Sequence, residues 1–190
     1  MVQDLFKTPL YETTLSLDNK ELTSYCLSMS KLNKGRILSN IGGWQSGDIG
    51  NEVIFKELFL NIVKHGNHFI KSLGITDTLK LDNSWININD YKDFNKNHIH
   101  PGAVLSGVYY IQTPKECGRI ALGHPAYTAF QYDWNLLNNN GYNTYNSSEW
   151  FLPVQQGILY IFPGWLYHRV EPSLNKKEKR ISISFNLIKY

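Results

Sequence analysis

The chain of 190 residues is long enough for one domain with a buried core. Hydrophobic residues make up 42% of it and charged residues 18%, a balance typical of a globular protein. The formal net charge of +3 is too small, and too little concentrated on one face, to indicate a nucleic-acid partner. We therefore expect a single globular domain over 1–190.

The cysteines and the N-terminus bear on the cellular compartment. Cys26 and Cys117 lie far apart and in no metal-like spacing, which is typical of free thiols in a reducing compartment. The first residues lack the basic start and apolar core of a signal peptide. No stretch approaches the roughly 18–20 apolar residues that a membrane span needs. These features predict a soluble cytoplasmic protein with no membrane partner.

The N-terminal part, 1–75, is predicted to be mostly helical after one leading strand. The segment 5–17 is extended in character, and Pro9 marks it as an edge strand because proline cannot donate to a central ladder. Asp18 is a helix-capping residue at the start of a helix over 18–33.

A second, long amphipathic helix is predicted over 51–74. Gly74 ends it, since glycine readily adopts the left-handed conformation found after a helix C-terminus. The helix carries one broad apolar stripe, which we expect to face the core. The stripe consists of Val53, Ile54, Leu58, Ile62, Phe69 and Leu73.

From residue 79 onward the pattern changes to β. Short segments rich in β-branched and aromatic residues alternate with Pro, Gly and Asn turns. Seven or eight such segments within about 110 residues indicate an antiparallel barrel or a double-sheet jelly roll, with the helices packed on one outer face. The candidate strands are 79–89, 104–113, 118–122, 126–132, 149–154, 157–163, 166–172 and 180–188.

A long polar loop, 132–150, interrupts this β region. It is rich in asparagine and connects two of the candidate strands. A long loop over the mouth of a barrel is a candidate substrate lid, and a plain surface loop is the alternative. The sequence leaves both open.

Three histidines form the candidate metal site. His98 and His100 are two residues apart, so on a strand both imidazoles face the same side. His168 follows the Pro163-Gly164 bend, on a segment that would face them in a jelly roll. Burying imidazoles without partners is costly, whereas neutral imidazole is a good ligand for iron, zinc, copper and nickel. The remaining histidines are interpreted as structural: His65, His68 and His124.

Arg180 is the candidate anion-binding residue. It begins a strand on which Ser182 and Ser184 share its face. A guanidinium fork with an added hydroxyl donor makes a good carboxylate clamp. The alternative is a surface arginine in the basic run 176–180. That alternative is disfavoured because the small serines leave room for a ligand.

Four stretches of the chain resemble the 2-oxoglutarate/Fe(II)-dependent oxygenase superfamily: SWININ (84–89), HIHPGAVLSGVYYIQTP (98–114), GILYIFPGWLYHRVEP (157–172) and KRISISFNL (179–187). More closely, they resemble a group of such oxygenases common in marine bacteria and their phages. The resemblance implies Fe(II), 2-oxoglutarate and O2 as cofactor and co-substrates. It implies a double-stranded β-helix (a jelly roll or cupin-like barrel) over 79–190, buttressed by the two helices of a support region, 1–75. For a phage protein the compartment would be the host cytoplasm.

The resemblance also assigns roles to residues. In the superfamily, H-x-D/E and a distal histidine hold the iron, and here His98, His100 and His168 match those positions. An R-x-S motif and a tyrosine usually hold the far carboxylate of 2-oxoglutarate. The matching residues are Arg180, Ser182 and Tyr110, whereas Tyr109 should point the other way. Three further residues are expected to border the pocket: Asn186, Ser106 and Trp85.

One departure from the superfamily pattern matters, because His100 replaces the usual carboxylate. His100 is either a ligand itself, giving a three-histidine site, or a carboxylate from Asp93 or Glu171 steps in. In a third arrangement His100 takes the role of the first histidine. Gly102 then stands at the carboxylate position and leaves it open, as in halogenases.

The expected function is that of a 2-oxoglutarate-dependent dioxygenase, by default a hydroxylase. Its substrate, a protein side chain or a small molecule, is left open by the sequence, as is its assembly, with a homodimer as one arrangement. One alternative is a cupin-like metal enzyme that does not use 2-oxoglutarate. It is disfavoured because no glutamate follows the H-x-H and because a cupin needs no Arg180 clamp. The other alternative is a non-enzymatic β-sandwich binding module.

Overall fold

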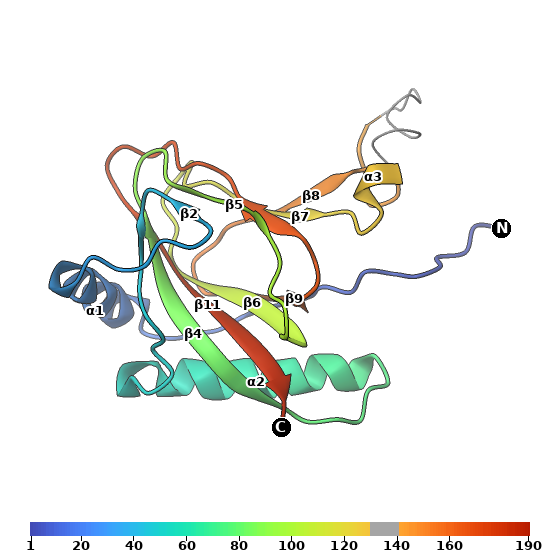
Figure 1. Cartoon of the computed structure of the whole chain (residues 1–190), viewed down its shortest axis with the longest axis horizontal. Coiled ribbons are helices and arrows are strands. Elements are labelled where there is room, and N and C mark those ends of the chain that lie inside the picture. The colour runs from blue at the N-terminus through green and yellow to red at the C-terminus, as the bar shows by residue number, and fades with distance from the viewer. Residues whose placement is uncertain (130–140) are drawn as a thin grey trace.

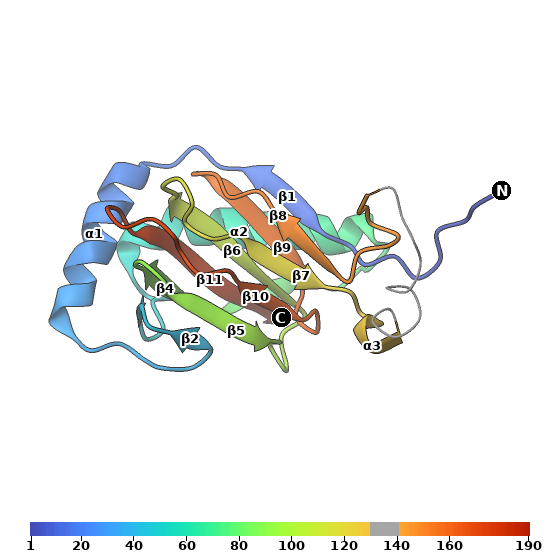
Figure 2. The ribbon, with the colours of Figure 1, turned by 90° about the horizontal axis from the view of Figure 1, so that it is seen from above.

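Three layers make up the computed structural model, which describes residues 1–129 and 141–190. The helix α2 runs beneath the larger of two antiparallel sheets, and the smaller sheet lies over the other face (Figures 1 and 2). Among the described residues, six strands form the larger sheet, in the spatial order β1 (Tyr11–Thr14), β9 (Ile158–Pro163), β6 (Leu105–Gln112), β11 (Arg180–Lys189), β4 (Leu79–Asn89) and β3 (Trp44–Gln45). Five described strands form the smaller sheet, in the order β2 (Asn40–Ile41), β5 (Phe94–His98), β10 (His168–Val170), β7 (Ile120–Gly123) and β8 (Glu149–Leu152).

The alternation of side chains along β11 explains why the sheet separates an apolar layer from a polar one. Successive residues of a strand point to opposite faces. One set of β11 side chains, Ile181, Ile183, Phe185 and Leu187, is fully buried and packs with the apolar faces of the helices. The other set, Arg180, Ser182, Ser184 and Asn186, lines the space between the two sheets. Each fully buried apolar side chain contributes about 1.5–3 kcal/mol, so the helix-facing layer is the main source of stability.

The helix α1 spans Asn19–Leu32 and begins as expected. The Oδ1 atom of Asp18 accepts hydrogen bonds from the backbone N–H groups of Lys20 and Glu21, at 3.1 and 3.0 Å. Such a cap satisfies two of the N–H groups that have no partner within the helix. The predicted capping role of Asp18 is confirmed.

The second predicted helix is divided into a 3-10 turn, η1 (Val53–Phe55), and the helix α2 (Lys56–Ser72). Its central stripe is confirmed, since Leu58, Ile62 and Phe69 are buried. The prediction was wrong at both ends, because Val53 is 82% exposed and Leu73 is 46% exposed. Val53 lies in the 3-10 turn and Leu73 follows the last helical residue, so the helical period does not extend to either of them.

Most of the predicted strands are present, with two kinds of exception. The segment 126–132 was predicted as a strand, but its described part contains the short helix α3 (Tyr127–Ala129). This helix follows a turn at His124, in which the Tyr127 N–H donates to the His124 carbonyl at 2.9 Å. The rest of that segment lies outside the described residues. The strands β2, β3 and β5 were not predicted. They are short, and β5 reads Phe-Asn-Lys-Asn-His, which has no apolar alternation.

Two further expectations concern the edge of the larger sheet and the long loop. Among the described strands, β1 pairs with β9 alone and ends its sheet, so the predicted edge strand near Pro9 is confirmed. Of the predicted lid, 132–140 lie outside the described residues. Its described part precedes β8 as a series of turns. In the described part of the chain, no helix has both the length and the apolar character needed to cross a bilayer.

Candidate active site

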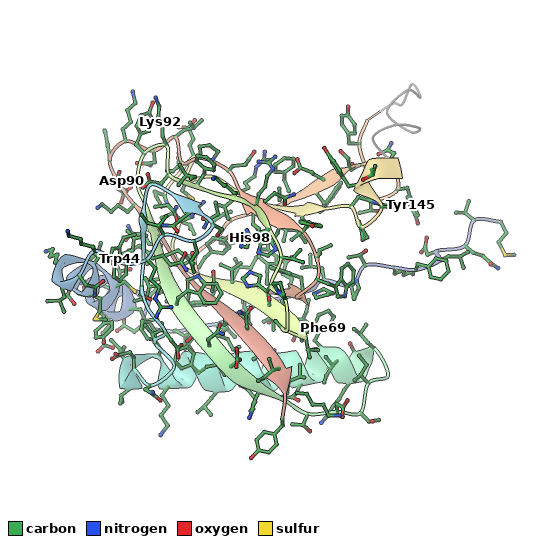
Figure 3. The ribbon with its side chains drawn as sticks, viewed as in Figure 1. Trp44, Phe69, Asp90, Lys92, His98 and Tyr145 are labelled. Atoms are coloured by element: carbon green, nitrogen blue, oxygen red, sulfur yellow. The ribbon has the colours of Figure 1, made fainter. Side chains whose placement is uncertain are left out.

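The three candidate ligands come from neighbouring strands and one turn. His98 ends β5, His168 begins β10, and the two residues are directly paired. His100 lies beyond the end of β5, where its backbone N–H donates to the Gly164 carbonyl at 2.9 Å. A turn, not strand alternation, therefore brings the His100 imidazole to the same place. One ring nitrogen from each histidine lies within 4.8 Å of the others, and His98 points into the space between the sheets (Figure 3).

Backbone carbonyls fix the orientation of two of the imidazoles. The Nδ1 atom of His98 is 2.7 Å from the Lys96 carbonyl, and that of His168 is 2.9 Å from the Leu166 carbonyl. A carbonyl only accepts, so Nδ1 carries the proton in each ring and Nε2 keeps its lone pair. The Nε2 atoms of His100 and His168 are 3.2 Å apart. Two metal–nitrogen bonds of about 2.1 Å that meet at about a right angle would separate their nitrogens by about 3 Å. This donor set therefore fits a metal ion.

The surroundings keep all three imidazoles neutral. Burial lowers the pKa of each ring, and together with the neighbouring His98 it lowers the pKa of His100 to about 4 and that of His168 to about 3. Trp85 stacks on His100 with 5.6 Å between ring centroids, and Phe162 lies 4.9 Å from His168. The apolar rings disfavour imidazolium, so the lone pairs stay available for a metal ion.

The two carboxylates considered as substitute ligands are engaged elsewhere. Asp93 accepts from the backbone N–H of Asp90 at 2.7 Å, and Glu171 forms a two-pronged ion pair with Arg119 at 2.8 and 3.1 Å. Among the described residues, the cluster of potential metal ligands consists of the three histidines and contains no carboxylate. Of the arrangements left open by the sequence, the geometry favours the one in which His100 joins the other two histidines.

Arg180 lines the same cavity as the three histidines. It is only 2% exposed, and its Nη1 atom donates to the carbonyls of Cys117 and Gly118 at 2.8 and 3.0 Å. Among the ion pairs of the described residues, none involves this guanidinium. A buried charge without a counter-ion costs several kcal/mol, so the site is suited to an anion.

Sequence reasoning did not anticipate the two carbonyls that orient Arg180. Gly118 has φ +80°, and a Cβ atom there would collide with the Glu171 carbonyl. Only glycine fits this backbone, which places the Gly118 carbonyl beside the guanidinium. In the sequence, the only indication of this arrangement is the glycine that follows Cys117.

Ser182 and Tyr110 lie beside Arg180 as a cross-strand pair. They are directly opposite each other on β11 and β6, and both line the cavity. Burial raises the pKa of Tyr110, so its phenol stays protonated and able to donate. Tyr109 points the other way, as predicted, and its hydroxyl donates to Oδ1 of Asn19 in α1 at 2.8 Å.

One cavity of about 710 Å³ is lined by the three histidines and by Arg180, Ser182 and Tyr110. Asn186 and Trp85 also line it. Ser106 does not lie in the wall; its Oγ donates to Oδ1 of Asn186 at 2.7 Å and so supports that residue from behind. Sequence reasoning missed several polar lining residues, because polar side chains of these types are typical of solvent-facing positions. These residues are Arg36, Gln45, Asn83, Asn87 and Asn95.

The family model described as "Putative 2OG-Fe(II) oxygenase" matches residues 83–186. The matched stretch contains the three clustered histidines, Tyr110, Arg180 and Ser182. The chain therefore belongs to this family of oxygenases. It is a 2-oxoglutarate-dependent dioxygenase that uses Fe(II), 2-oxoglutarate and O2. None of the curated proteins matches the chain.

Solved structures share the jelly-roll fold at low sequence identity. A Pseudomonas putida prolyl-4-hydroxylase is 12% identical with a TM-score of 0.65, and the match covers 96% of this chain and 94% of that one. The α-ketoglutarate-dependent epimerase SnoN from nogalamycin biosynthesis is 11% identical with a TM-score of 0.66, covering 95% and 78%. A viral collagen prolyl hydroxylase from Paramecium Bursaria Chlorella virus-1, in complex with 2-oxoglutarate, is 14% identical with a TM-score of 0.60, covering 94% of both chains. The expected fold class is thereby confirmed.

Proposed function

We propose that the protein is a hydroxylase in which His98, His100 and His168 bind Fe(II), and in which Arg180, with its two neighbours, binds the far carboxylate of 2-oxoglutarate. One observation carries this proposal. A buried guanidinium with no ion-pair partner among the described residues lines the same cavity as a cluster of three neutral histidines. A chelating dicarboxylate with a 2-oxo group matches both features at once.

The residues of the proposed site have two roles, to bind the ligands and to orient the groups that bind them. When bound, Fe(II) and 2-oxoglutarate supply O2 activation, and the overall reaction converts a substrate C–H, 2-oxoglutarate and O2 into C–OH, succinate and CO2. The guanidinium of Arg180 donates hydrogen bonds to the far carboxylate, and the hydroxyls of Ser182 and Tyr110 add two donors. The Lys96 and Leu166 carbonyls hold the imidazole tautomers of His98 and His168, so that the Nε2 lone pairs would be available to bind the metal ion.

Hydroxylation is favoured over halogenation by the position of His100. Halogenation would correspond to the arrangement in which the ligand position at Gly102 is open. The H-x-H pair contributes both of its rings to the cluster, so the proposed ligand set is complete without that opening. The structural neighbours from Pseudomonas putida and from the Chlorella virus are prolyl hydroxylases, which supports the same outcome.

The test is an anaerobic titration of the Fe(II)-loaded protein with 2-oxoglutarate, watching the visible charge-transfer band of a chelated 2-oxoacid. We expect the band in the wild type and much weaker binding in Arg180→Met, which keeps the volume but removes the charge. Arg169→Met is the matched control, since Arg169 is paired with Glu149 at 2.8 Å outside this site. Iron binding without a band would reject the use of 2-oxoglutarate at this site. No iron binding would reject the histidine assignment.

A further inference from the structure

One wall of the cavity lies outside the stretch that matches the family. Residues 36–48 contribute it, whereas the family match covers 83–186. This segment carries β2, which pairs with β5 in the smaller sheet, and β3, which pairs with β4 in the larger one. It therefore crosses between the two sheets and closes their open edge. Since the metal and co-substrate residues all lie within the matched stretch, this wall is suited to selecting the substrate.

Neutral amides dominate the space that this wall encloses. Gln45, Asn87 and Asn95 are each less than a tenth exposed and line the cavity. Neighbours hold two of them in place: Nδ2 of Asn87 donates to Ser184 Oγ at 2.9 Å, and Nδ2 of Asn95 donates to Ser39 Oγ at 3.1 Å.

An amide offers two N–H donors and a carbonyl oxygen with two lone pairs, so one such bond leaves most of its capacity for a ligand. An apolar substrate would bury these groups without partners, which costs about 1–3 kcal/mol for each group. The cavity therefore favours a substrate that itself forms hydrogen bonds.

The rim of this region carries an excess of positive charge. Arg36 from the wall and Lys96 from β5 both line the cavity, and neither appears in an ion pair among the described residues. The acidic residue in the lining is Asp48, whose Oδ1 accepts from the backbone N–H groups of Ser84 and Gly50 at 2.9 and 3.2 Å. Two cations against one engaged carboxylate favour an anionic group on the substrate.

We propose that the substrate is a small, hydrogen-bonding molecule that carries a carboxylate or a phosphate, with its uncharged part on the amides and its acidic group at Arg36 and Lys96. The size of the cavity, about 710 Å³ and shared with 2-oxoglutarate, suits a metabolite-sized molecule. This inference rests on the proposed function, because it takes the reacting carbon to lie beside the histidines.

The test compares matched probes that differ only in the acidic group. One pair is N-acetylproline and N-acetylprolinamide, and the other is uridine 5′-monophosphate and uridine. The first pair tests for a carboxylate and the second for a phosphate. Binding to the Fe(II)–2-oxoglutarate enzyme is measured by anaerobic calorimetry, and succinate release is measured in air. We expect the acidic member of at least one pair to bind at least about tenfold more tightly. Arg36→Ala and Lys96→Ala should each reduce that ratio by roughly fivefold.

Lys34→Ala is the control, since Lys34 is an exposed cation two residues before Arg36 that does not line the cavity. It should leave the ratio unchanged. The charge-transfer band of 2-oxoglutarate should persist in all three variants, and its absence from the wild type would reject the proposed function instead. With the band present, the substrate proposal is overturned if the acidic probes bind no more tightly than the neutral ones. It is also overturned if their preference survives the double variant of Arg36 and Lys96.

Discussion

Tyr109 and Tyr110 are adjacent on β6 and point to opposite faces of the sheet, so we expect one to affect stability and the other to affect ligand binding. Tyr110 faces the cavity beside Arg180, whereas the Tyr109 hydroxyl donates to Asn19 on the helix side of the sheet. We predict that Tyr110→Phe raises the Kd of 2-oxoglutarate by roughly threefold to tenfold, because it removes one hydrogen-bond donor from the carboxylate site. The charge-transfer titration measures this Kd.

The matched variant, Tyr109→Phe, should have the opposite profile. It removes a buried hydrogen bond to α1, so the free energy of unfolding should fall by about 1 kcal/mol. The Kd of 2-oxoglutarate should stay at the wild-type value. Equal effects of both variants on that Kd would show that Tyr110 acts through the packing of the sheet and not through the ligand.

The histidines allow a second comparison at the residue scale. We predict that His98→Ala and His168→Ala each lower the affinity for Fe(II) by more than about 100-fold, since loss of a supporting contact alone costs 10- to 100-fold. His100→Asp should retain binding, because a carboxylate is also a good ligand for Fe(II). Anaerobic calorimetry with Fe(II) gives the affinities.

His65→Ala is the control for the metal ligands. His65 lies on α2, far in sequence from the cluster, and its Nδ1 atom is 2.7 Å from the Tyr11 hydroxyl. Its replacement should leave Fe(II) affinity unchanged. Retention of affinity in His168→Ala would contradict the assignment of the cluster as the iron site.

The histidines and the arginine that meet in the cavity could be predicted from the sequence, whereas the groups that support them could not. The spacing of His98, His100 and His168 and the Arg180-x-Ser182 pattern point to ligands, because few other residue types perform these roles. The amides of the cavity carry no such signal. Asn87 becomes a lining residue only because β4 lies between β3 and β11, and that neighbourhood is set by long-range pairing.

At the scale of elements, the pairing of β6 with its neighbours depends on Gly107. A Cβ atom at this position would collide with the Phe185 ring and with the Tyr160 carbonyl. We predict that Gly107→Ala lowers the free energy of unfolding by about 3 kcal/mol or more, since the obstructing carbonyl belongs to the backbone of β9 and cannot move aside. Urea denaturation measures the change.

A second glycine separates steric collision from backbone strain. Gly102 has φ +88°, but no atom lies within 4 Å of a Cβ placed there. Gly102→Ala should therefore cost only the left-handed strain of about 1–2 kcal/mol. A larger loss for Gly102→Ala than for Gly107→Ala would show that the turn after His100, and not the packing of β6, limits stability.

Elements with strong periodicity were predicted well, and elements defined by their neighbours were not. The alternation along β11 and the buried stripe of α2 follow from local sequence. The strand β5 is polar, and it is a strand because β10 pairs with it on one side and β2 on the other. Conversely, Tyr127–Ala129 has aromatic and β-branched residues but follows a turn at His124, and the local turn overrides strand propensity there.

At the scale of the whole molecule, the stabilising core and the polar cavity lie on opposite faces of one sheet. The apolar cluster between that sheet and the helices stabilises the fold without the ligands. The space between the sheets holds a smaller apolar cluster together with a buried guanidinium and three neutral imidazoles. The metal-free protein should therefore fold, but with the cost of a buried guanidinium that forms no ion pair among the described residues.

Ligand binding should remove that cost, and thermal unfolding can measure it. With Fe(II) bound, 2-oxoglutarate binds only the folded state, so at about 100 times its Kd it should stabilise the Fe(II)-loaded protein by about 2.7 kcal/mol. For a chain of this size we predict a rise in Tm of about 5–10 °C. The rise should require both ligands, because the proposed binding mode of 2-oxoglutarate uses the metal ion at the histidines and also Arg180. His168→Ala should lose most of it, and His65→Ala should retain it. A full shift with 2-oxoglutarate in the presence of a chelator would mean that the anion site alone accounts for binding and that the metal ion lies elsewhere.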